Sequence, residues 1–202
     1  MTIGQMTGDV IDPVEAKKQL RRAGKEIRGR IVKSAGAEIA QNLARHGLDF
    51  CKPFPGPVVS GFAPFGEELD TVPLMTRLIE EGATMSLPVM VAKAQPLIFR
   101  EWKPGDEMKE AMWGIMEPRD EAPLAVPDVL LVPLLAFDLR GYRIGYGGGF
   151  YDRTIAGLRA IKTIVTVGIA VDEMRVEAVP HDGYDEKVDW VLTQSGPIRC
   201  NG

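Results

Sequence analysis

The chain has 202 residues, of which 45% are apolar and 26% are charged, and its formal net charge is −4 at pH 7. This is the composition of a globular protein with a core, and the negative balance excludes a broad basic surface for nucleic acid. No apolar run approaches the ~20 residues of a membrane-spanning helix, and the N-terminal stretch lacks the apolar core of a signal peptide. Only two cysteines occur, without a CxxC pair, so we expect a cytoplasmic protein with no membrane partner.

The N-terminal part of the chain predicts a leader followed by a long helix. Residues 1–12 are expected to form a flexible leader, and residues 13–202 a single α/β domain. Asp12 can cap a helix whose first position is Pro13. The helix is expected to fray near His46 and Gly47. Its apolar face is marked by residues that recur at spacings of four and seven: Leu20, Ile27, Ile31, Ala35, Ile39 and Leu43.

Strands and helices alternate along the rest of the chain. Two further helices are expected, one beginning near Asp70 and Thr71 and one over 150–159. Strands are expected over the ranges 58–65, 84–91, 95–102, 129–137, 163–171 and 189–193. The run VLLVPLLAF (129–137) shows no polar alternation, which is typical of a strand in a parallel sheet covered on both faces. Residues 117–128 hold three prolines and are expected to form a surface connection. This order predicts a three-layer α/β fold with helices on both faces of the sheet.

A glycine-rich stretch, FDLRGYRIGYGGGFYDR (137–153), lies between the most apolar predicted strand and a helix. Glycines let backbone N–H groups approach phosphate oxygens, and the N-terminus of the following helix adds positive potential. The stretch matches neither the P-loop nor the dinucleotide fingerprint, and a plain hairpin or tight turn is the alternative. Asp152 at the helix start could hold Mg²⁺ together with phosphates, or could serve only as a partner of the helix dipole.

Five ordered segments resemble the 5-formyltetrahydrofolate cyclo-ligase (5,10-methenyltetrahydrofolate synthetase) family. Besides the glycine-rich stretch they are KKQLRR (17–22), GEELDT (66–71), WGIMEP (113–118) and DGYDEKVDWVLT (182–193). The resemblance implies a Rossmann-like sheet similar to that of sugar-phosphate isomerases and CoA transferases. It also implies conversion of 5-formyltetrahydrofolate and ATP to 5,10-methenyltetrahydrofolate, ADP and phosphate, with Mg²⁺ as cofactor.

The same resemblance implies residue roles. Arg143, Tyr151 and Asp152 would be catalytic, and Asp152 and Asp185 would hold the metal. ATP would be bound by Lys17, Lys18, Arg21, Arg143, Ile144, Gly145, Tyr146, Gly147, Gly148, Gly149, Phe150 and Tyr151. The folate would be bound by Phe62, Ala63, Phe65, Glu68, Trp113, Tyr146, Gly147, Gly148, Gly149 and Phe150. Glu68 would accept hydrogen bonds from pterin N–H groups, since a carboxylate is a bidentate acceptor.

Several of these residues also have a purely structural interpretation. Lys17 and Arg21 are four apart on one helix face, and a solvated basic face would look the same. Trp113 could be a core residue, and Asp185 an ordinary loop carboxylate. The family role of Glu68 could fall on Glu67 if the register is one residue off.

Position 150 departs from the family, because many relatives have Tyr where this chain has Phe150; any role of that hydroxyl is therefore in doubt here. We interpret His181 as a loop histidine.

The sequence is compatible with three functions. The first is the cyclo-ligase, acting on small molecules as a monomer. The second is a folate- or nucleotide-binding relative that has lost catalysis. The third, by fold analogy alone, is a sugar-phosphate isomerase or CoA transferase, which would not need the N-terminal basic pair or Asp152.

Overall fold

The computed structural model describes residues 12–51 and 55–201, so the predicted leader lies outside the described residues apart from Asp12. An eight-stranded sheet forms its centre. Its strands, in spatial order, are β12 (Gly196–Arg199), β11 (Trp190–Thr193), β10 (Val165–Ile169), β7 (Val129–Pro133), β1 (Val58–Ser60), β2 (Thr84–Val89), β3 (Ile98–Glu101) and β6 (Leu124–Ala125). The five strands from β11 to β2 run parallel, and β12, β3 and β6 are antiparallel to their neighbours.

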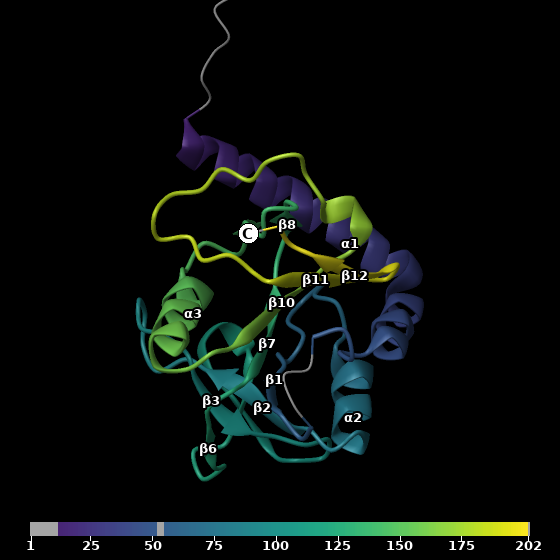
Figure 1. The fold of residues 1–202 in the computed structure, drawn as a ribbon, viewed down its shortest axis with the longest axis vertical. Helices are drawn as coiled ribbons and strands as arrows, with labels where there is room; N and C mark the ends of the chain where they lie inside the picture. Colours follow the sequence, from purple (N-terminus) through teal and green to yellow (C-terminus); the bar gives the residue numbers. More distant parts are fainter. Residues whose placement is uncertain (1–11, 52–54, 202) are drawn as a thin grey trace, which may run out of the picture.

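Helices cover the sheet on both sides. The α-helices are α1 (Pro13–His46), α2 (Val72–Glu80) and α3 (Phe150–Ile161), and two short 3₁₀ turns are η1 (Met112–Gly114) and η2 (Asp172–Met174). Figure 1 shows α1 and α2 on one side of the sheet and α3 on the other. The predicted α/β fold with a mostly parallel sheet between helices is therefore confirmed.

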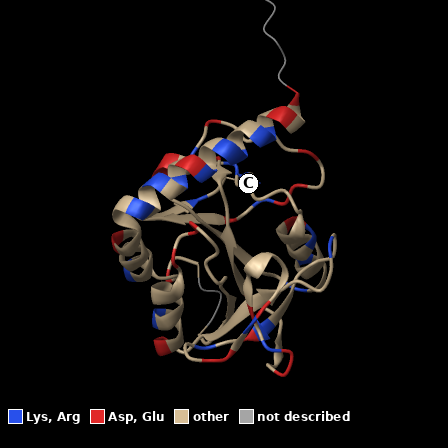
Figure 2. Cartoon of the chain, turned by 180° about the vertical axis from the view of Figure 1, so that it is seen from behind, with Lys and Arg blue, Asp and Glu red and all other residues tan. Residues whose placement is uncertain are grey.

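The ends of α1 follow the local chemistry of the chain. The Asp12 side chain accepts a hydrogen bond from the Val14 N–H at 3.3 Å, Pro13 opens the helix, and Gly47 caps its end. Gly24, in the helix interior, lets α1 pack closely against the backbone at Leu135. A Cβ at this position would lie 2.0 Å from the Leu135 carbonyl oxygen. Figure 2 shows acidic and basic residues distributed along the exposed length of α1.

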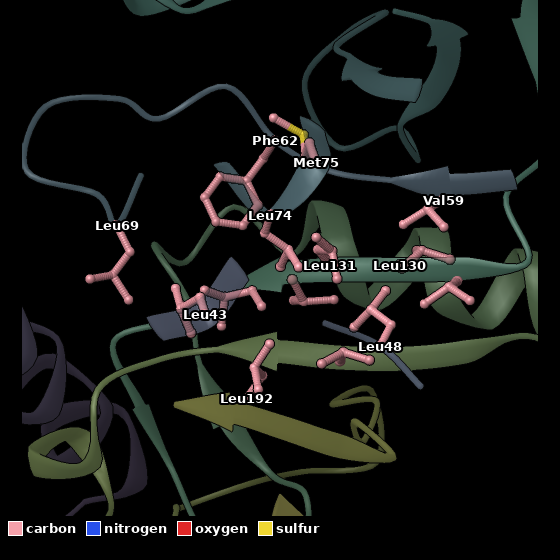
Figure 3. Packing of buried hydrophobic residues seen from close by; sticks show 14 of the residues in the cluster. Leu43, Leu48, Val59, Phe62, Leu69, Leu74, Met75, Leu130, Leu131 and Leu192 are labelled. Carbon is pink, nitrogen blue, oxygen red and sulfur yellow. The ribbon is translucent and has the colours of Figure 1, made fainter. Parts of the chain in front are cut away.

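The core cluster joins the sheet to α1 and α2 on one face and to Ile155 of α3 on the other. In β7, residues Val129–Val132 are fully buried, as the unbroken apolar run predicts. Figure 3 shows Leu130 and Leu131 of β7 packed with Leu43 and Leu48.

The range 129–137, which was expected to form one strand, contains two separate strands, β7 and β8 (Ala136–Phe137). The chain leaves the main sheet after Pro133, and β8 pairs instead with β9 (Arg143–Ile144). The side chain of Asp138 accepts hydrogen bonds from the N–H groups of Arg140 and Tyr142 and so stabilises the reversal between them. The hairpin alternative therefore holds for residues 137–144, and the glycine-rich loop proper begins at Gly145.

Other bounds also differ from the prediction. The strand expected over 58–65 ends at Ser60, because the following residues turn into a cavity wall. The connection 117–128 contains part of β5 (Met116–Pro118), which pairs with β4 (Met108–Glu110), and all of β6. A strand not expected from the sequence, β12, follows 189–193. These strands are short and lie in small sheets or at sheet edges, so they lack the buried apolar runs on which the prediction depends.

The order of the parallel strands fixes where a ligand can bind. Taken along the chain as first to fifth, β1, β2, β7, β10 and β11 lie in the order 2-1-3-4-5. The chain therefore winds in opposite directions from β1 and from β7. Such a reversal opens a crevice at the carboxyl ends of the two neighbouring strands, which is the usual ligand site of open α/β sheets.

Candidate active site

A cavity of about 740 Å³ occupies this crevice. Its walls come from α1, the segment after β1, the glycine-rich loop with the start of α3, and the β4–β5 region. Except for Lys18, every residue predicted to bind ATP, folate or metal lines this one cavity. A smaller hollow of about 540 Å³ beside β2 and β3 contains none of them.

The phosphate-cradle part of the cavity is the segment from Gly145 to the start of α3. Gly149 is the N-cap of α3 with φ of 64°, a conformation that favours glycine, and it offers no side chain to cap the first N–H groups. These N–H groups therefore remain available to an anion, at the positive end of the helix dipole. Arg21 ties α1 to this loop, because its Nε donates to the Gly145 carbonyl at 3.1 Å.

Charged side chains from distant parts of the chain meet at this end. Arg143 is buried, donates through Nη2 to Asp152 Oδ1 at 2.8 Å and through Nη1 to the Glu186 carbonyl. Lys17 contacts Asp185 at 2.6 Å and Asp182 at 3.2 Å. Burial lowers the pKa of Lys17, but hydrogen bonds and charge from Asp185 and Asp182 outweigh it and raise the pKa above its ordinary value. Lys17 is thus a protonated cation at the cavity.

The cavity wall also holds a buried carboxylate, Glu68. Its Oε2 accepts from the Phe65 N–H at 3.0 Å, and its Oε1 lies 3.9 Å from the Arg28 guanidinium. Burial raises the pKa of Glu68, against the opposing effects of hydrogen bonds from Tyr146 and Phe65 and of the Arg28 charge. Glu67 instead points outward and pairs with Lys33 at 2.7 Å. The structure thus places Glu68, not Glu67, in the cavity wall.

Aromatic side chains lie among these charged groups, and Tyr151 is close enough to both Glu68 and Arg143 for their charges to act on its pKa. Burial and the nearby Glu68 raise the pKa of Tyr146 to about 12, and the pKa of Tyr151 is raised by burial in the same direction. Both phenols are therefore neutral donors near pH 7. Trp113 is 58% exposed, which excludes a core role, and lies edge-on to Phe150 with ring centroids 6.5 Å apart. Its φ of 64° is strained for a bulky residue, a feature that clusters at ligand sites.

Two residues discussed from the sequence lie elsewhere. Lys18 is exposed and pairs with Glu15 on the same helix at 3.5 Å, so its predicted contact with ATP has no support from the geometry. His181 stacks on Tyr142 with ring centroids 3.6 Å apart and does not line the cavity.

Sequence reasoning missed two buried charged residues at the site. Arg28 donates to the Tyr146 hydroxyl at 2.5 Å and so joins the glycine-rich loop to Glu68. It lies eleven residues after Lys17 and seven after Arg21, on the same helix face, which is a signal that could have found it. Glu117, in the WGIMEP segment, lines the cavity and is 2% exposed. Nothing in the spacing of the residues around it predicts that it is buried. Apolar residues missed in the same wall are Pro88, Met90, Leu97, Ile115, Met116 and Pro133.

A metal ion has no ready-made protein cage in the described part of the chain, where no group of three or more His, Cys, Asp or Glu residues could hold one. Asp152 and Asp185 each face a cation, Arg143 and Lys17. Within the described residues, Asp152 Oδ2 accepts no hydrogen bond. This donor set fits Mg²⁺ bound mainly by phosphate oxygens with one or two carboxylates, which is the usual arrangement for this ion.

Comparison with known proteins decides the family. The model of the 5-formyltetrahydrofolate cyclo-ligase family matches residues 13–194. The chain belongs to this family. A 5-formyltetrahydrofolate cyclo-ligase of Escherichia coli K12 is 37% identical over 163 residues, which cover 78% of this chain and 89% of that protein. The Haemophilus influenzae protein of the same name is 30% identical over 176 residues, covering 85% and 94% of the two chains. The resemblance stated from the five sequence segments, to a family of ligases, is thereby confirmed.

Solved structures in this cyclo-ligase family agree with the fold. The 5,10-methenyltetrahydrofolate synthetase of Aquifex aeolicus, solved by NMR, superimposes with a TM-score of 0.73 at 26% identity and covers 92% of this chain and 93% of its own. A Mycoplasma pneumoniae synthetase, at 19% identity and a TM-score of 0.68, shows the same fold. In the described part of this cyclo-ligase-family chain, every helix is too short or too polar to cross a membrane.

Proposed function

We propose that this protein converts 5-formyltetrahydrofolate to 5,10-methenyltetrahydrofolate with consumption of ATP and release of ADP and phosphate. One observation carries the proposal beyond family membership. Apart from Lys18, the residues predicted for ATP and those predicted for folate line a single cavity, whose wall holds both cations and buried carboxylates. Two substrates that must react with each other need such a shared site.

The chemistry requires activation of a formamide, which is a poor electrophile with a poor leaving group. Transfer of the γ-phosphoryl group from ATP to the formyl oxygen makes the carbon electrophilic and converts the oxygen into a leaving group. Folate N10 then attacks that carbon and closes the ring, the N10 proton is released to the departing phosphate or to water, the C–O bond breaks, and phosphate leaves. Each ATP thus yields one ADP, one phosphate and one methenyl product.

The phosphates would lie on the glycine-rich loop and the N-terminus of α3. Arg21 and Arg143 would neutralise their charge, and Lys17 would join them by exchanging its partner Asp185 for phosphate oxygens. This exchange releases the Asp185 carboxylate just where Mg²⁺ could use it beside Asp152. The ion would supply further neutralisation of the triphosphate.

The folate would lie against Phe62, Ala63 and Trp113, with Glu68 as a polar contact. Tyr151, whose raised pKa keeps its hydroxyl protonated, would act as a hydrogen-bond donor between the two substrates. Phe150 lacks the hydroxyl that many relatives carry at this position, and its ring lies edge-on to Trp113. We place the protein in the cytoplasm as a monomer.

A ligand-stabilisation experiment tests the proposal against the two alternatives. We expect MgATP and 5-formyltetrahydrofolate each to raise the melting temperature, and sugar phosphates to leave it unchanged. Incubation with both should release ADP and methenyltetrahydrofolate in a one-to-one ratio. Stabilisation by both ligands without product would favour the non-catalytic relative, and stabilisation by sugar phosphates alone would favour the isomerase-like function.

A further inference from the structure

Glu117 is the most deeply buried charged residue in the cavity wall. It lies on β5, is 2% exposed, and accepts a hydrogen bond from the Met90 N–H through Oε1 at 2.9 Å. Within residues 12–51 and 55–201, no cation lies within ion-pair distance of it and Oε2 receives no hydrogen bond. A carboxylate removed from water in this way is costly unless another group compensates it.

The other buried carboxylate of the cavity, Glu68, differs in this respect. It already receives the Phe65 N–H and the Tyr146 hydroxyl, and the Arg28 guanidinium lies beside it. Both of its oxygens therefore have partners within the protein before any ligand enters, although burial still raises its pKa. Glu117 lacks that compensation, which makes it the stronger acceptor available to a ligand.

The surroundings of Glu117 restrict the chemistry of that ligand. Pro88, Met90, Leu97, Ile115 and Pro133 line the same cavity and are apolar, so a second charge on the ligand would go unpaired there. A flat group with apolar faces and adjacent N–H donors on one edge would satisfy both the carboxylate and these walls. Two parallel N–H···O bonds to one carboxylate form the strongest arrangement of this kind.

We propose that Glu117 is a specificity-determining residue that accepts the N3–H and 2-amino N–H groups of the pterin pyrimidine ring. This assignment rests on the proposed function and refines it, because Glu68 was the acceptor expected from the sequence. The pterin is the part of the folate with two adjacent N–H donors on one edge of a flat ring, while its 4-oxo group is an acceptor. In this arrangement Glu68 contacts the folate elsewhere, beside the Arg28 guanidinium.

The test compares 5-formyltetrahydrofolate with its 2-desamino analogue, which lacks one of the two donors, by calorimetric titration in the absence of ATP. We expect the wild-type protein to bind the analogue about tenfold or more weakly, the value of a charge-assisted hydrogen bond. Glu117→Gln should lower affinity for 5-formyltetrahydrofolate by a similar factor and abolish most of the discrimination. Its amide oxygen can still accept from Met90, so the melting temperature and MgATP binding should be retained.

Glu110→Gln on the neighbouring strand β4 is the matched control, since Glu110 is exposed, and it should behave as wild type. Glu68→Gln should retain discrimination against the analogue. Equal binding of the two folates by the wild-type protein, a measurement that needs no variant, would overturn the assignment. So would a loss of discrimination in Glu68→Gln with none in Glu117→Gln. Failure of the wild type to bind either folate would overturn the proposed function as well.

Discussion

Asp138 stabilises the hairpin that positions Arg143 and the glycine-rich loop at the cavity. We expect its replacement by Asn to destabilise the fold. The residue is fully buried. Its Oδ1 accepts from the N–H groups of Arg140 and Tyr142, and its Oδ2 accepts from the Arg140 guanidinium and the Val179 N–H. All of these groups are hydrogen-bond donors. An amide NH₂ in place of one carboxylate oxygen would therefore face donors and would break the hydrogen bonds that this oxygen accepts.

The size of the effect follows from this arrangement. The amide introduced by Asp138→Asn would offer one acceptor oxygen, and in either of its orientations at least two donors lose their partner. The Arg140 side chain is 45% exposed and can turn to water, whereas the Val179 N–H is buried and the N–H groups of Arg140 and Tyr142 are partly buried. A buried donor without a partner costs about 1–3 kcal/mol, so we expect Asp138→Asn to destabilise the fold by about 2–4 kcal/mol. For a protein of this size this corresponds to a fall in melting temperature of roughly 5–12 °C.

The pH dependence of this difference provides a second readout. Burial raises the pKa of Asp138, but hydrogen bonds from Val179 and Arg140 outweigh it and hold the pKa below its usual value. The carboxylate therefore stabilises the fold above the ordinary carboxyl pKa, and this contribution is lost as pH falls through the lowered pKa. The difference between wild type and variant in urea unfolding should be largest near pH 7 and shrink below about pH 4.

Asp120→Asn is the control for Asp138→Asn, since Asp120 is an exposed carboxylate paired with Lys109. It should change stability by less than about 0.5 kcal/mol. If Asp138→Asn were equally mild at pH 7, or its effect did not vary with pH, the account of the hairpin would be wrong.

Three further predictions concern the cavity and the helix beside it. Lys17→Ala should raise the KM for ATP about tenfold, near the lower end for a charged contact because Lys17 must first leave Asp185. The control Lys18→Ala should leave this KM unchanged. Equal effects of the two variants would favour the interpretation of this helix face as a solvated basic surface. Asp152→Asn should raise the Mg²⁺ concentration for half-maximal activity about tenfold or more, and an unchanged Mg²⁺ titration would remove Asp152 from the metal site. Gly24→Ala should destabilise the fold by roughly 1–3 kcal/mol through overpacking and so lower the melting temperature by several degrees, because the new Cβ would meet the backbone of Leu135. A melting temperature equal to that of the wild type would show that α1 can shift without cost.

The parts of this fold that sequence predicts best are those fixed by local chemistry. The long helix could be bounded at both ends because Asp12, Pro13 and Gly47 act through the few residues around them. The buried centre of the sheet could be recognised because β7 and β10 are covered on both faces. The turn at Asp138 could be predicted only as an alternative, since part of its stabilisation comes from the Val179 N–H, which lies 41 residues away.

The candidate site shows the same division. Lys17 and Arg21 could be selected from helix spacing and family resemblance, and the structure brings both to the cavity. Glu117 could not be assigned a role, because its importance comes from burial and the lack of a counter-charge within the described residues, which are properties of tertiary packing. Arg28 is intermediate, because its spacing from Arg21 was visible while its contact with Tyr146 was not.

The most direct test of the account is the absorbance of methenyltetrahydrofolate formed by the purified protein from 5-formyltetrahydrofolate. With ATP and Mg²⁺ both present, we predict continuous formation of product. Omission of ATP, or chelation of the divalent ion, should each abolish it. Product formation without ATP, or no product in the complete mixture, would contradict the proposal that this cavity couples phosphoryl transfer to ring closure.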